Sequence, residues 1–470
     1  MRHCLHAPAD ARKRASLGHG GPAAVLAAIC GSLLLACGPQ AQSPAPQTHS
    51  TPDGQRPDLG GEWLLSDVYN AHRGEWTLAS GDPLYIPTEL VAPGQEASEL
   101  ARANRDRMLE VRLPGGSFPA LPAGTVVRGL RGAIGRGEQA GQLNLDRLPE
   151  TGPAAWPGEP PKAGGALRVA SLNLLNYFNG DGRGGGFPTE RGARSPEEFE
   201  AQGDRLRAAF AAMDPGLLAV QELENDGFGP HSAARSLAGL LNAADHDDWA
   251  VIDPGTGPVG GDVITVGLFY RESVLEPVGG AKILQELPFR GLSRQPLAQR
   301  FRERASGSEF WVIVNHLKSK GGCPETGPNR DQDDGQGCWN AARTNAVRAL
   351  AAWLDELATG SGTPRILVLG DMNAWRQEDP IRAFREAGYL EAVEERSGLP
   401  QYSYRYFGQR GTLDYAFASP ALLPHARRAF IWHINADMPR NMDLPRPWLR
   451  ASDHDPVIVD LDFSQSATSD

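Results

Sequence analysis

The chain lacks a surplus of positive charge. It has 46 Lys and Arg against 57 Asp and Glu, which gives a formal net charge of −11 over 470 residues. Proteins that bind polyanions through a broad basic surface carry the opposite balance. If the substrate is a polyanion, metal ions and a local basic patch must therefore supply the attraction.

The chain also lacks an apolar run long enough to cross a bilayer comfortably. The candidate, residues 22–36, is too short and follows a basic stretch at residues 12–14, as in a secretory signal. Its end, "LLLACG", resembles the lipobox of bacterial lipoproteins, which implies cleavage before Cys37 and acylation of that cysteine. An ordinary secretory signal is the alternative. Either way we expect an exported chain with a signal peptide at 1–36 and a flexible tether at 37–57.

Cysteine is scarce, with 5 residues in all, and Cys4 and Cys30 fall inside the predicted signal. Besides Cys37, this leaves Cys323 and Cys338, with 14 residues between them in a Gly- and Asp-rich loop. In an oxidising compartment such a pair favours a disulfide. The alternative, two thiolates of a zinc site, lacks neighbouring ligands at the usual short spacing.

The distribution of apolar runs divides the chain into parts, and no internal repeat is visible. Short alternating runs split by Gly and Pro predict β structure before a proline-rich break, and no constellation of catalytic residue types lies there. After the break, compact apolar strands alternate with helical stretches, which predicts an α/β architecture. The expected parts are a small β-rich accessory domain 58–150, a Pro/Gly linker 151–165, an α/β domain 166–464 and a tail 465–470. Within the α/β domain we expect strands at 168–178, 217–223, 263–271, 309–317, 365–371, 413–419, 426–434 and 456–463, and helices at 196–213, 231–243, 341–358 and 379–387, the last with Asp379 as N-cap.

Polar side chains occur where these strands end. Because neighbouring strand ends converge at one edge of a sheet, we expect these side chains to lie close together. Oxygen ligands without clustered Cys or His favour Mg²⁺, Mn²⁺ or Ca²⁺ over zinc, and two histidines with carboxylate partners suit proton transfer at a phosphate. The set predicts metal-assisted phosphoester hydrolysis. Its members are Asn173, Glu222, His316, Asp371, Asn373, Asp414, Asp453 and His454.

The segments that carry these residues, "RVASLNLLNYF", "VQELEN", "VNHLKSK", "LGDMNAW", "GTLDYAF" and "SDHDPV", resemble the endonuclease/exonuclease/phosphatase superfamily, which includes deoxyribonuclease I and exonuclease III. The strings "NHLKSKGG" and "DDGQGCWNAAR" are similar to its bacterial extracellular nuclease branch. The resemblance implies a four-layer sandwich of two packed mixed β-sheets flanked by helices, with residues 166–464 as the catalytic domain. The oligonucleotide-binding-like module that usually lies upstream in that branch is expected to be missing or cut short.

The resemblance also implies roles for individual residues. Glu222 would be the principal ligand of Mg²⁺ or Mn²⁺, with Glu224 as the alternative. His454 would contact the scissile phosphate. The other implied roles are metal binding by Asn173 and Asp453, positioning and deprotonation of the attacking water by Asp371 and Asn373, orientation of the His454 ring by Asp414, a second phosphate contact or leaving-group protonation by His316, and binding of neighbouring phosphates by Lys318 and Arg343.

The loop "NRDQDDGQGCW" leaves one further site open. Asp331, Asp333 and Asp334 are spaced like part of a calcium loop, but the distal bidentate glutamate of an EF-hand is lacking. A structural Ca²⁺ site and a solvated acidic turn are the two alternatives.

Together these patterns predict an exported, metal-dependent nuclease that hydrolyses extracellular DNA, with RNA as a further substrate left open. The membrane is the expected partner of the acylated Cys37, Gly38 favours the outer membrane, and no protein partner is evident. The alternatives are a phosphoesterase of the same superfamily acting on lipid or inositol head groups, and a surface lipoprotein that binds without catalysis.

Overall fold

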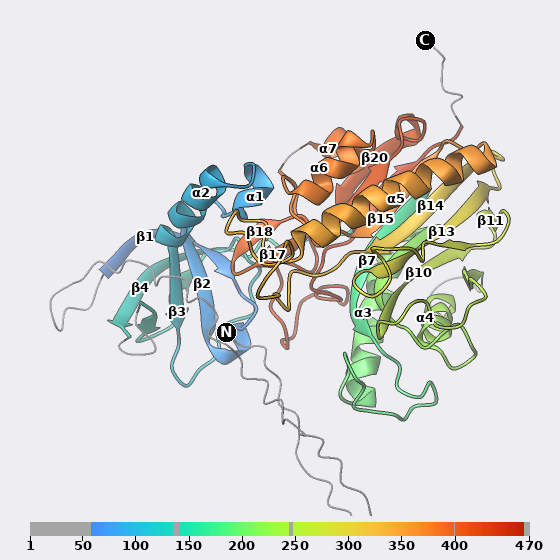
Figure 1. Cartoon of the computed structure of the whole chain (residues 1–470). Coiled ribbons are helices and arrows are strands. Elements are labelled where there is room, and N and C mark those ends of the chain that lie inside the picture. Colours follow the sequence, from blue (N-terminus) through green and yellow to red (C-terminus); the bar gives the residue numbers. More distant parts are fainter. Residues whose placement is uncertain (1–57, 136–140, 244–247, 399, 465–470) are drawn as a thin grey trace, which may run out of the picture. The chain divides into compact units, whose positions relative to one another are not determined.

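The computed structural model describes residues 58–135, 141–243, 248–398 and 400–464 (Figure 1). The predicted signal peptide, the tether with Cys37 and the tail 465–470 lie outside the described residues. In the described part of the chain, no helix combines the length and the apolar character needed to cross a membrane.

The N-terminal strands form a small closed sheet. Its order is β1-β2-β3-β5-β4, β1 also pairs with β4, and β3 and β5 run parallel. This is a five-stranded Greek-key barrel of the oligonucleotide-binding type, so the expectation that such a module is missing or cut short is wrong. The bounds are β1 Asp58–Asp67, η1 Ala71–Arg73, β2 Glu75–Ser80, α1 Pro87–Leu90, α2 Gln95–Asp106, β3 Met108–Arg112, β4 Val126–Ile134, β5 Leu143–Leu145 and β6 Glu150–Thr151, which pairs with β4.

Two larger sheets follow from residue 167 onward, and both are mixed. The pairs β7–β8 and β14–β15 are parallel, whereas the other pairs are antiparallel. The first sheet has the order β20 (Ala426–Ile431), β21 (Val457–Leu461), β7 (Leu167–Tyr177), β8 (Leu217–Glu224), β10 (Ile264–Arg271), β9 (Trp249–Val251). The second has the order β11 (Leu275–Pro277), β13 (Arg294–Glu303), β14 (Glu309–His316), β15 (Ile366–Asp371), β19 (Asp414–Ala418), β16 (Leu390–Glu391), with β12 (Lys282–Ile283) on β13.

Three hydrophobic cores define the layers. The largest contains Val169 and Leu268 of the first sheet together with Val312 and Leu369 of the second, so the two sheets face each other. Another core lies between the first sheet and helices α3 and α4, and a third between the second sheet and helices α5 and α6, with α5 running across β14 and β15 in Figure 1. The mixed α/β fold with helix-flanked sheets and an N-terminal β region is therefore confirmed. The helices are α3 Pro196–Met213, α4 Ala233–Asn242, α5 Asn340–Ser361, α6 Asp379–Glu386 and α7 Ala392–Ser397, with the short turn η3 Leu423–His425.

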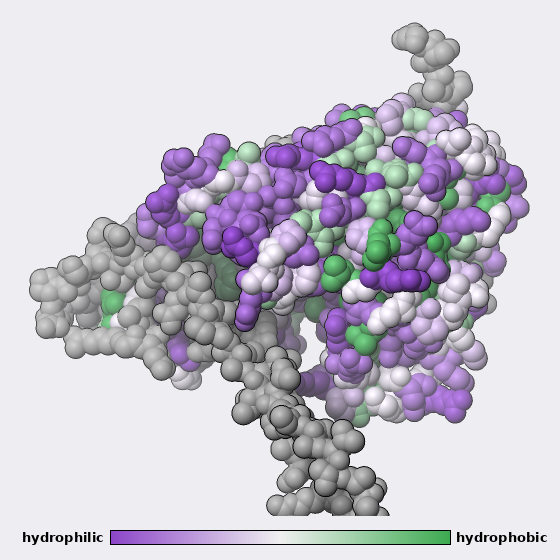
Figure 2. Space-filling model, viewed as in Figure 1, coloured by the Kyte–Doolittle hydropathy of each residue, from purple (hydrophilic) through white to green (hydrophobic). Residues whose placement is uncertain are grey.

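Local sequence explains most of these elements. Every residue of β15 is buried, as expected for a continuous apolar run covered on both faces. Ser195 caps α3 by accepting from the amide of Glu198, and Pro196 follows at the first helical position. One expected cap is wrong, because Glu378 rather than Asp379 is the N-cap of α6. Hydrophilic side chains cover most of the face shown in Figure 2.

Candidate active site

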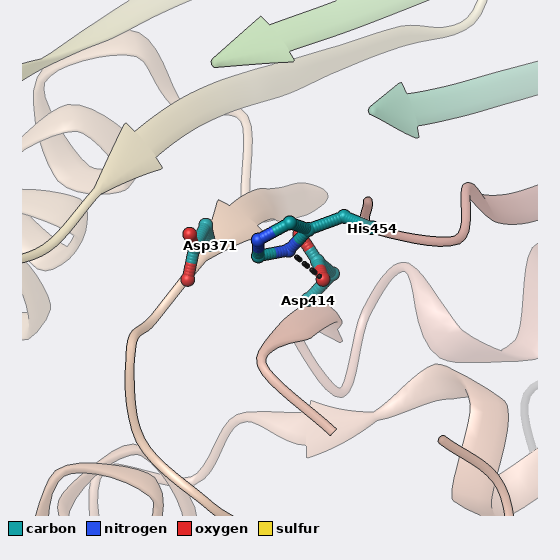
Figure 3. Close-up of side chains that lie close together, drawn as sticks. All are labelled: Asp371, Asp414 and His454. Carbon is teal, nitrogen blue, oxygen red and sulfur yellow. Dashed lines mark hydrogen bonds and ion pairs between the residues drawn. The ribbon is translucent and has the colours of Figure 1, made fainter. Parts of the chain in front are cut away.

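Asp371, Asp414 and His454 meet where β15 and β19 lie side by side, and Figure 3 shows the imidazole ring between the two carboxylates. Asp371 is paired with Asp414 in the antiparallel register of the two strands, which brings the carboxylates to one place. His454 Nδ1 lies 2.8 Å from Asp414 Oδ2. One ligand atom from each of the three buried residues lies within 4.8 Å of the others, a spacing that could hold a metal ion.

Asp414 is itself held in place by Ser403. The hydroxyl of Ser403 donates to Asp414 Oδ2 at 2.6 Å, and it accepts from the amides of Leu413 and Asp414 at 3.0 Å each. Oδ2 of Asp414 therefore accepts hydrogen bonds from both Ser403 and His454, and these bonds fix the orientation of the His454 ring. Its second oxygen, Oδ1, is buried and has no hydrogen-bond partner.

Asp414 and His454 influence each other's pKa. Burial opposes a charged ring, but Asp414, followed by Asp453 and Asp371, raises the pKa of His454 well above its ordinary value. Burial also raises the pKa of Asp414, against the opposing charge of His454. The ring is consequently a strong hydrogen-bond donor toward an anion such as a phosphate.

Asp371 stays ionised because several donors converge on it. Burial would raise its pKa, but the hydrogen bond from His316 and the charge of His454 hold the pKa below its ordinary value. His316 Nε2 and Asn173 Nδ2 each lie 3.3 Å from Asp371 Oδ2, and the amide of Asn373 donates to Oδ1 at 2.8 Å. An ionised carboxylate fixed by three donors suits the positioning of a water molecule.

His316 is an uncharged member of the site. Burial and the nearby charge of Arg294 lower the pKa of His316 to about 4. Its side chain is 2% exposed, and its Nδ1 has no hydrogen-bond partner. At neutral pH His316 is therefore a neutral donor to Asp371.

Glu222 is crowded by other carboxylates. Burial and the charge of Asp453 raise the pKa of Glu222, whereas His454 and a hydrogen bond from Asn173 lower it. A divalent cation would relieve this repulsion, so the donor set of Glu222, Asp453 and Asn173 fits Mg²⁺ or Mn²⁺. The backbone is strained at Glu222, because it has a φ value of 60°, which a residue other than glycine or asparagine rarely adopts.

Lys318 and Arg343 differ in their access to solvent. Lys318 lies over the ring of Trp339, with Nζ 5.0 Å from its centroid, and donates to the carbonyls of Ser319 and Gly321 at 3.1 Å each. Arg343 is 0% exposed. Its guanidinium donates to the carbonyls of Lys318, Cys338 and Gln336 at 3.2, 2.9 and 3.3 Å, so Arg343 supports the loop from inside. The prediction that Arg343 binds a phosphate is therefore wrong, because its side chain is buried.

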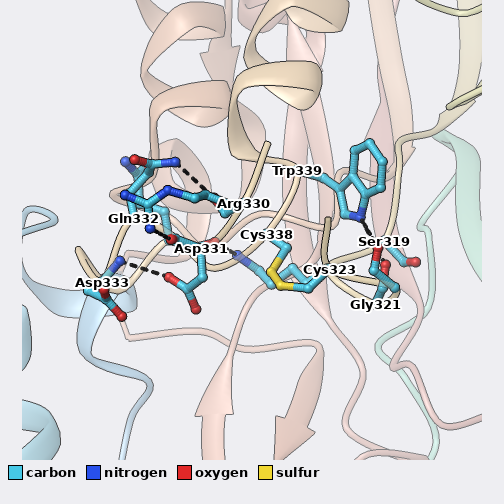
Figure 4. The surroundings of a disulfide bond; sticks show 12 residues. Ser319, Gly321, Cys323, Arg330, Asp331, Gln332, Asp333, Cys338 and Trp339 are labelled. Carbon is cyan, nitrogen blue, oxygen red and sulfur yellow. Dashed lines mark hydrogen bonds between the residues drawn. A yellow bond between two sulfur atoms is a disulfide. The ribbon is translucent and has the colours of Figure 1, made fainter. Parts of the chain in front are cut away.

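Cys323 and Cys338 form a disulfide in this loop, which confirms the pairing, with their Cα atoms 5.4 Å apart (Figure 4). Asp331 accepts from the amide of Asp333 at 2.9 Å, and Asp334 from that of Gln336 at 3.0 Å, as in ordinary turns. Within the described ranges, these carboxylates do not converge on a shared ion position. The loop is a turn closed by the disulfide, and the calcium alternative has no support.

The match to a family model spans almost the whole site. The model of the Endonuclease/Exonuclease/phosphatase family matches residues 170–454, which include Asn173 and end at His454. The chain belongs to this family. As a member, it is a hydrolase acting on phosphoester bonds, and its buried Asp/Asp/His group is consistent with a divalent metal site.

No curated protein matches the chain, but solved structures do. They include the human Nocturnin catalytic domain with bound sulfate (18% identity, 64% of this chain and 95% of that chain, TM-score 0.42). A mannosyl-6-phosphatase of Bacteroides thetaiotaomicron has 18% identity over 63% of this chain and 100% of that chain, with a TM-score of 0.44. D. rerio TDP2 complexed with single strand DNA product has 16% identity over 63% of this chain and 99% of that chain, with a TM-score of 0.39.

The structure of this phosphoester hydrolase shows two site residues that sequence reasoning missed, Ser403 and Arg294. Ser403 orients Asp414. Arg294 on β13 is 8% exposed, and burial lowers its pKa although the charges of Asp262, Asp371 and Glu222 oppose that shift. Ser403 lies in a polar stretch without an apolar pattern, so the sequence held no signal for it. Arg294 begins a strand rich in Arg and Gln, which hides both the strand and the residue.

Proposed function

We propose that this member of the family is an exported, metal-dependent nuclease that hydrolyses phosphodiester bonds of extracellular DNA. The observation that carries the choice of a nucleic acid is a strip of aromatic and cationic side chains beside His454. The ring of Tyr404 lies 4.5 Å from that of His454. Burial raises the pKa of Tyr404, and the charges of Arg450 and Tyr69 also act on it, so these two residues lie nearby. The guanidinium groups of Arg440 and Arg450 lie 4.1 and 5.2 Å from the ring of Tyr69.

This strip supplies what the net charge of −11 lacks. Arg440 donates to Tyr69 Oη at 2.8 Å, and Arg450 donates to the carbonyl of Asn435 at 2.8 Å, so both guanidinium groups are held in fixed places. Fixed guanidinium groups next to aromatic rings suit a strand with alternating phosphates and bases. A small phosphomonoester would need only the catalytic group itself.

The proposed chemistry follows from the residues. Asp371 and Asn373 would position the attacking water, and Asp371 would accept its proton. His454, held by Asp414, would donate a hydrogen bond to the phosphate as negative charge grows there. A bound Mg²⁺ or Mn²⁺, held by Glu222, Asn173 and Asp453, would polarise a phosphate oxygen. His316 would contribute a hydrogen bond to Asp371 or to the phosphate.

The location is also a proposal. An acylated Cys37 would anchor the enzyme to a membrane, with Gly38 favouring the outer membrane, and residues 37–57 would serve as the tether. A Cys37→Ser variant should then move from the membrane fraction to the soluble exported fraction. Unchanged membrane association would overturn the anchor.

The test of the function is an activity matrix. Purified protein is incubated with plasmid DNA, linear DNA, RNA, phospholipids and inositol phosphates, each with Mg²⁺, Mn²⁺, Ca²⁺ or EDTA. We expect cleavage of DNA with Mg²⁺ or Mn²⁺, none with EDTA, and none by His454→Ala. Release of phosphate or a head group from lipids without DNA cleavage would establish the lipid or inositol phosphoesterase instead. A Glu222→Ala/His454→Ala double variant that equals wild type in every assay would favour the non-catalytic lipoprotein.

A further inference from the structure

The hairpin formed by β17 (Tyr404–Tyr406) and β18 (Gln409–Gly411) carries two adjacent exposed aromatic rings. Tyr406 is 51% and Phe407 is 60% exposed, and the two rings meet edge to face with centroids 4.5 Å apart. Among the described residues, the other large hydrophobic side chains with comparable exposure are isolated leucines. Two adjacent exposed aromatic rings are a feature of binding surfaces.

The hairpin is held rigidly in its place. Phe407 has φ 45°, a conformation that a bulky side chain adopts only when the surroundings impose it. The next residue, Gly408, has φ 76°, and an added Cβ there would approach Ser66 Oγ to 3.0 Å. Backbone and side-chain bonds to the N-terminal part of the chain complete the support: Ser66 Oγ to Gly408 O at 2.5 Å, Asn104 Nδ2 to Gln409 Oε1 at 2.7 Å, and Ile86 N to Arg410 O and Arg410 N to Leu84 O at 2.8 Å each.

The direction of the hairpin links these rings to the catalytic histidine. Side chains two residues apart on a strand point to the same face, so Tyr406 follows Tyr404 on one face, roughly 7 Å further along. The ring of Tyr404 contacts that of His454 at 4.5 Å. A strand whose phosphate lies at His454 would therefore pass Tyr404 and then reach Tyr406 and Phe407.

The nearby arginines and the exposure of the two rings indicate which kind of ligand binds there. Arg440 and Arg450 beside Tyr69 provide cations for a phosphate backbone near the same active site. Bases in a duplex stack on one another and present only their edges, whereas unpaired bases offer a free face to an aromatic ring.

From these observations, and resting on the proposed nuclease function, we propose that Tyr406 and Phe407 form a stacking platform for unpaired bases. The platform would hold the single-stranded part of the substrate next to the scissile phosphate. It would make the enzyme prefer single strands and frayed or overhanging ends to intact duplex.

The test compares binding of a labelled single-stranded oligothymidylate and a duplex of equal length, measured by fluorescence anisotropy in EDTA so that no cleavage occurs. We expect the Tyr406→Ser/Phe407→Ser double variant to bind the single strand about 5- to 100-fold more weakly and the duplex within about twofold of wild type. A Tyr406→Trp/Phe407→Trp variant should retain the single-strand affinity. Leu287→Ser, at a leucine that is 76% exposed, is the matched control and should bind as wild type.

The melting temperatures of all four proteins should agree, because Tyr406, Phe407 and Leu287 are exposed and their replacement removes no buried side chain. If wild type cuts DNA but the double serine variant binds single strands as tightly as wild type, the platform is overturned and the proposed function stands. Equal losses of single-strand and duplex affinity would also overturn the stacking of unpaired bases. If wild type neither binds nor cuts any nucleic acid, both proposals fall.

Discussion

Glu89 of α1 and Arg376 of the loop after β15 form a buried ion pair, with Oε1 and Nε 3.1 Å apart and both side chains 2% exposed. Thr412 donates to the same carboxylate from its amide at 3.0 Å and from its hydroxyl at 2.9 Å. Arg376 follows Asn373 in the loop that begins with Asp371. The N-terminal part of the chain thus supports the segment that carries Asp371 and Asn373, the residues proposed to position the water.

Replacing Glu89 by Ala should leave the guanidinium of Arg376 with less compensation in a buried place. We expect a loss of about 3 to 5 kcal/mol in the free energy of unfolding, measured by urea denaturation. Glu62→Ala is the matched control, because Glu62 pairs with Arg128 while both remain exposed, and it should cost less than about 1 kcal/mol. Equal losses in the two variants would contradict the structural role of the Glu89 pair.

Replacing Asp414 by Asn should remove the charge that orients the ring of His454. We expect kcat to fall about 10²-fold or more while KM changes little. Asp414 raises the pKa of His454, so the limb of the pH–rate profile that reports this ring should move to lower pH in the variant. A profile identical in position to that of wild type would argue against the pairing.

Glu222 and Glu224 lie two residues apart on β8, so a matched pair of variants can test which of them binds the metal ion. Glu224 accepts from the amide of Asn179 at 3.0 Å, whereas Glu222 faces Asp453 and Asn173. Mg²⁺ should raise the melting temperature of wild type and of Glu224→Gln, and should do so much less for Glu222→Gln. If Glu224→Gln lost more of the Mg²⁺-dependent rise in melting temperature than Glu222→Gln, Glu224 rather than Glu222 would be the metal ligand.

The buried His316 should make stability depend on pH. Its pKa is lowered from 6.5 in the unfolded chain to about 4 in the folded protein, so protonation favours the unfolded chain. Its contribution is complete above pH 6.5 and is lost as pH falls toward 4, up to about 3 kcal/mol. In EDTA, the difference in unfolding free energy between pH 7 and 4.5 should be smaller for His316→Gln than for wild type. The exposed His231, replaced by Gln, should leave that difference unchanged.

The disulfide should stabilise its loop without taking part in the chemistry. Cys323 and Cys338 are separated by 15 positions, for which the chain-entropy estimate is about 3 kcal/mol. A Cys323→Ser/Cys338→Ser variant should melt at a lower temperature and respond no further to dithiothreitol. Wild type in dithiothreitol should resemble the variant. Equal melting temperatures for oxidised wild type and the variant would contradict this estimate.

The sequence could predict those elements whose residues repeat a simple pattern. The apolar runs of β14 and β15 end in His316 and Asp371, so both strands and both site residues were visible. The ten-residue strand β13 was not, because its buried positions include Arg294 and Gln299 among other polar residues. Its burial depends on a hydrogen-bonding partner strand and on nearby carboxylates, and neither is a local property.

The closed barrel was unpredictable for a related reason. Its short strands suggested β structure, but closure depends on the pairing of β1 with β4, such as Trp63 with Val127. Long-range pairing leaves little trace in local periodicity. The burial of Arg343 could not be predicted either, because a string similar to a nuclease motif does not say which basic side chain faces solvent.

Two parts of the site that are in contact in the folded protein are synthesised far apart in time. The hydroxyl of Ser452 donates to the carbonyl of Asn173 at 2.5 Å, across 279 positions, and β21 pairs with β7 directly after His454. At about 5 to 20 residues per second, a ribosome takes roughly 15 to 60 s to add the residues between them. Until residues 454–461 have been added, the growing chain has neither His454 nor the strand β21 that follows it. A chain that stops before residue 454 would lack His454 and the strand that pairs with β7, so we expect a prematurely terminated product to hydrolyse no phosphoester.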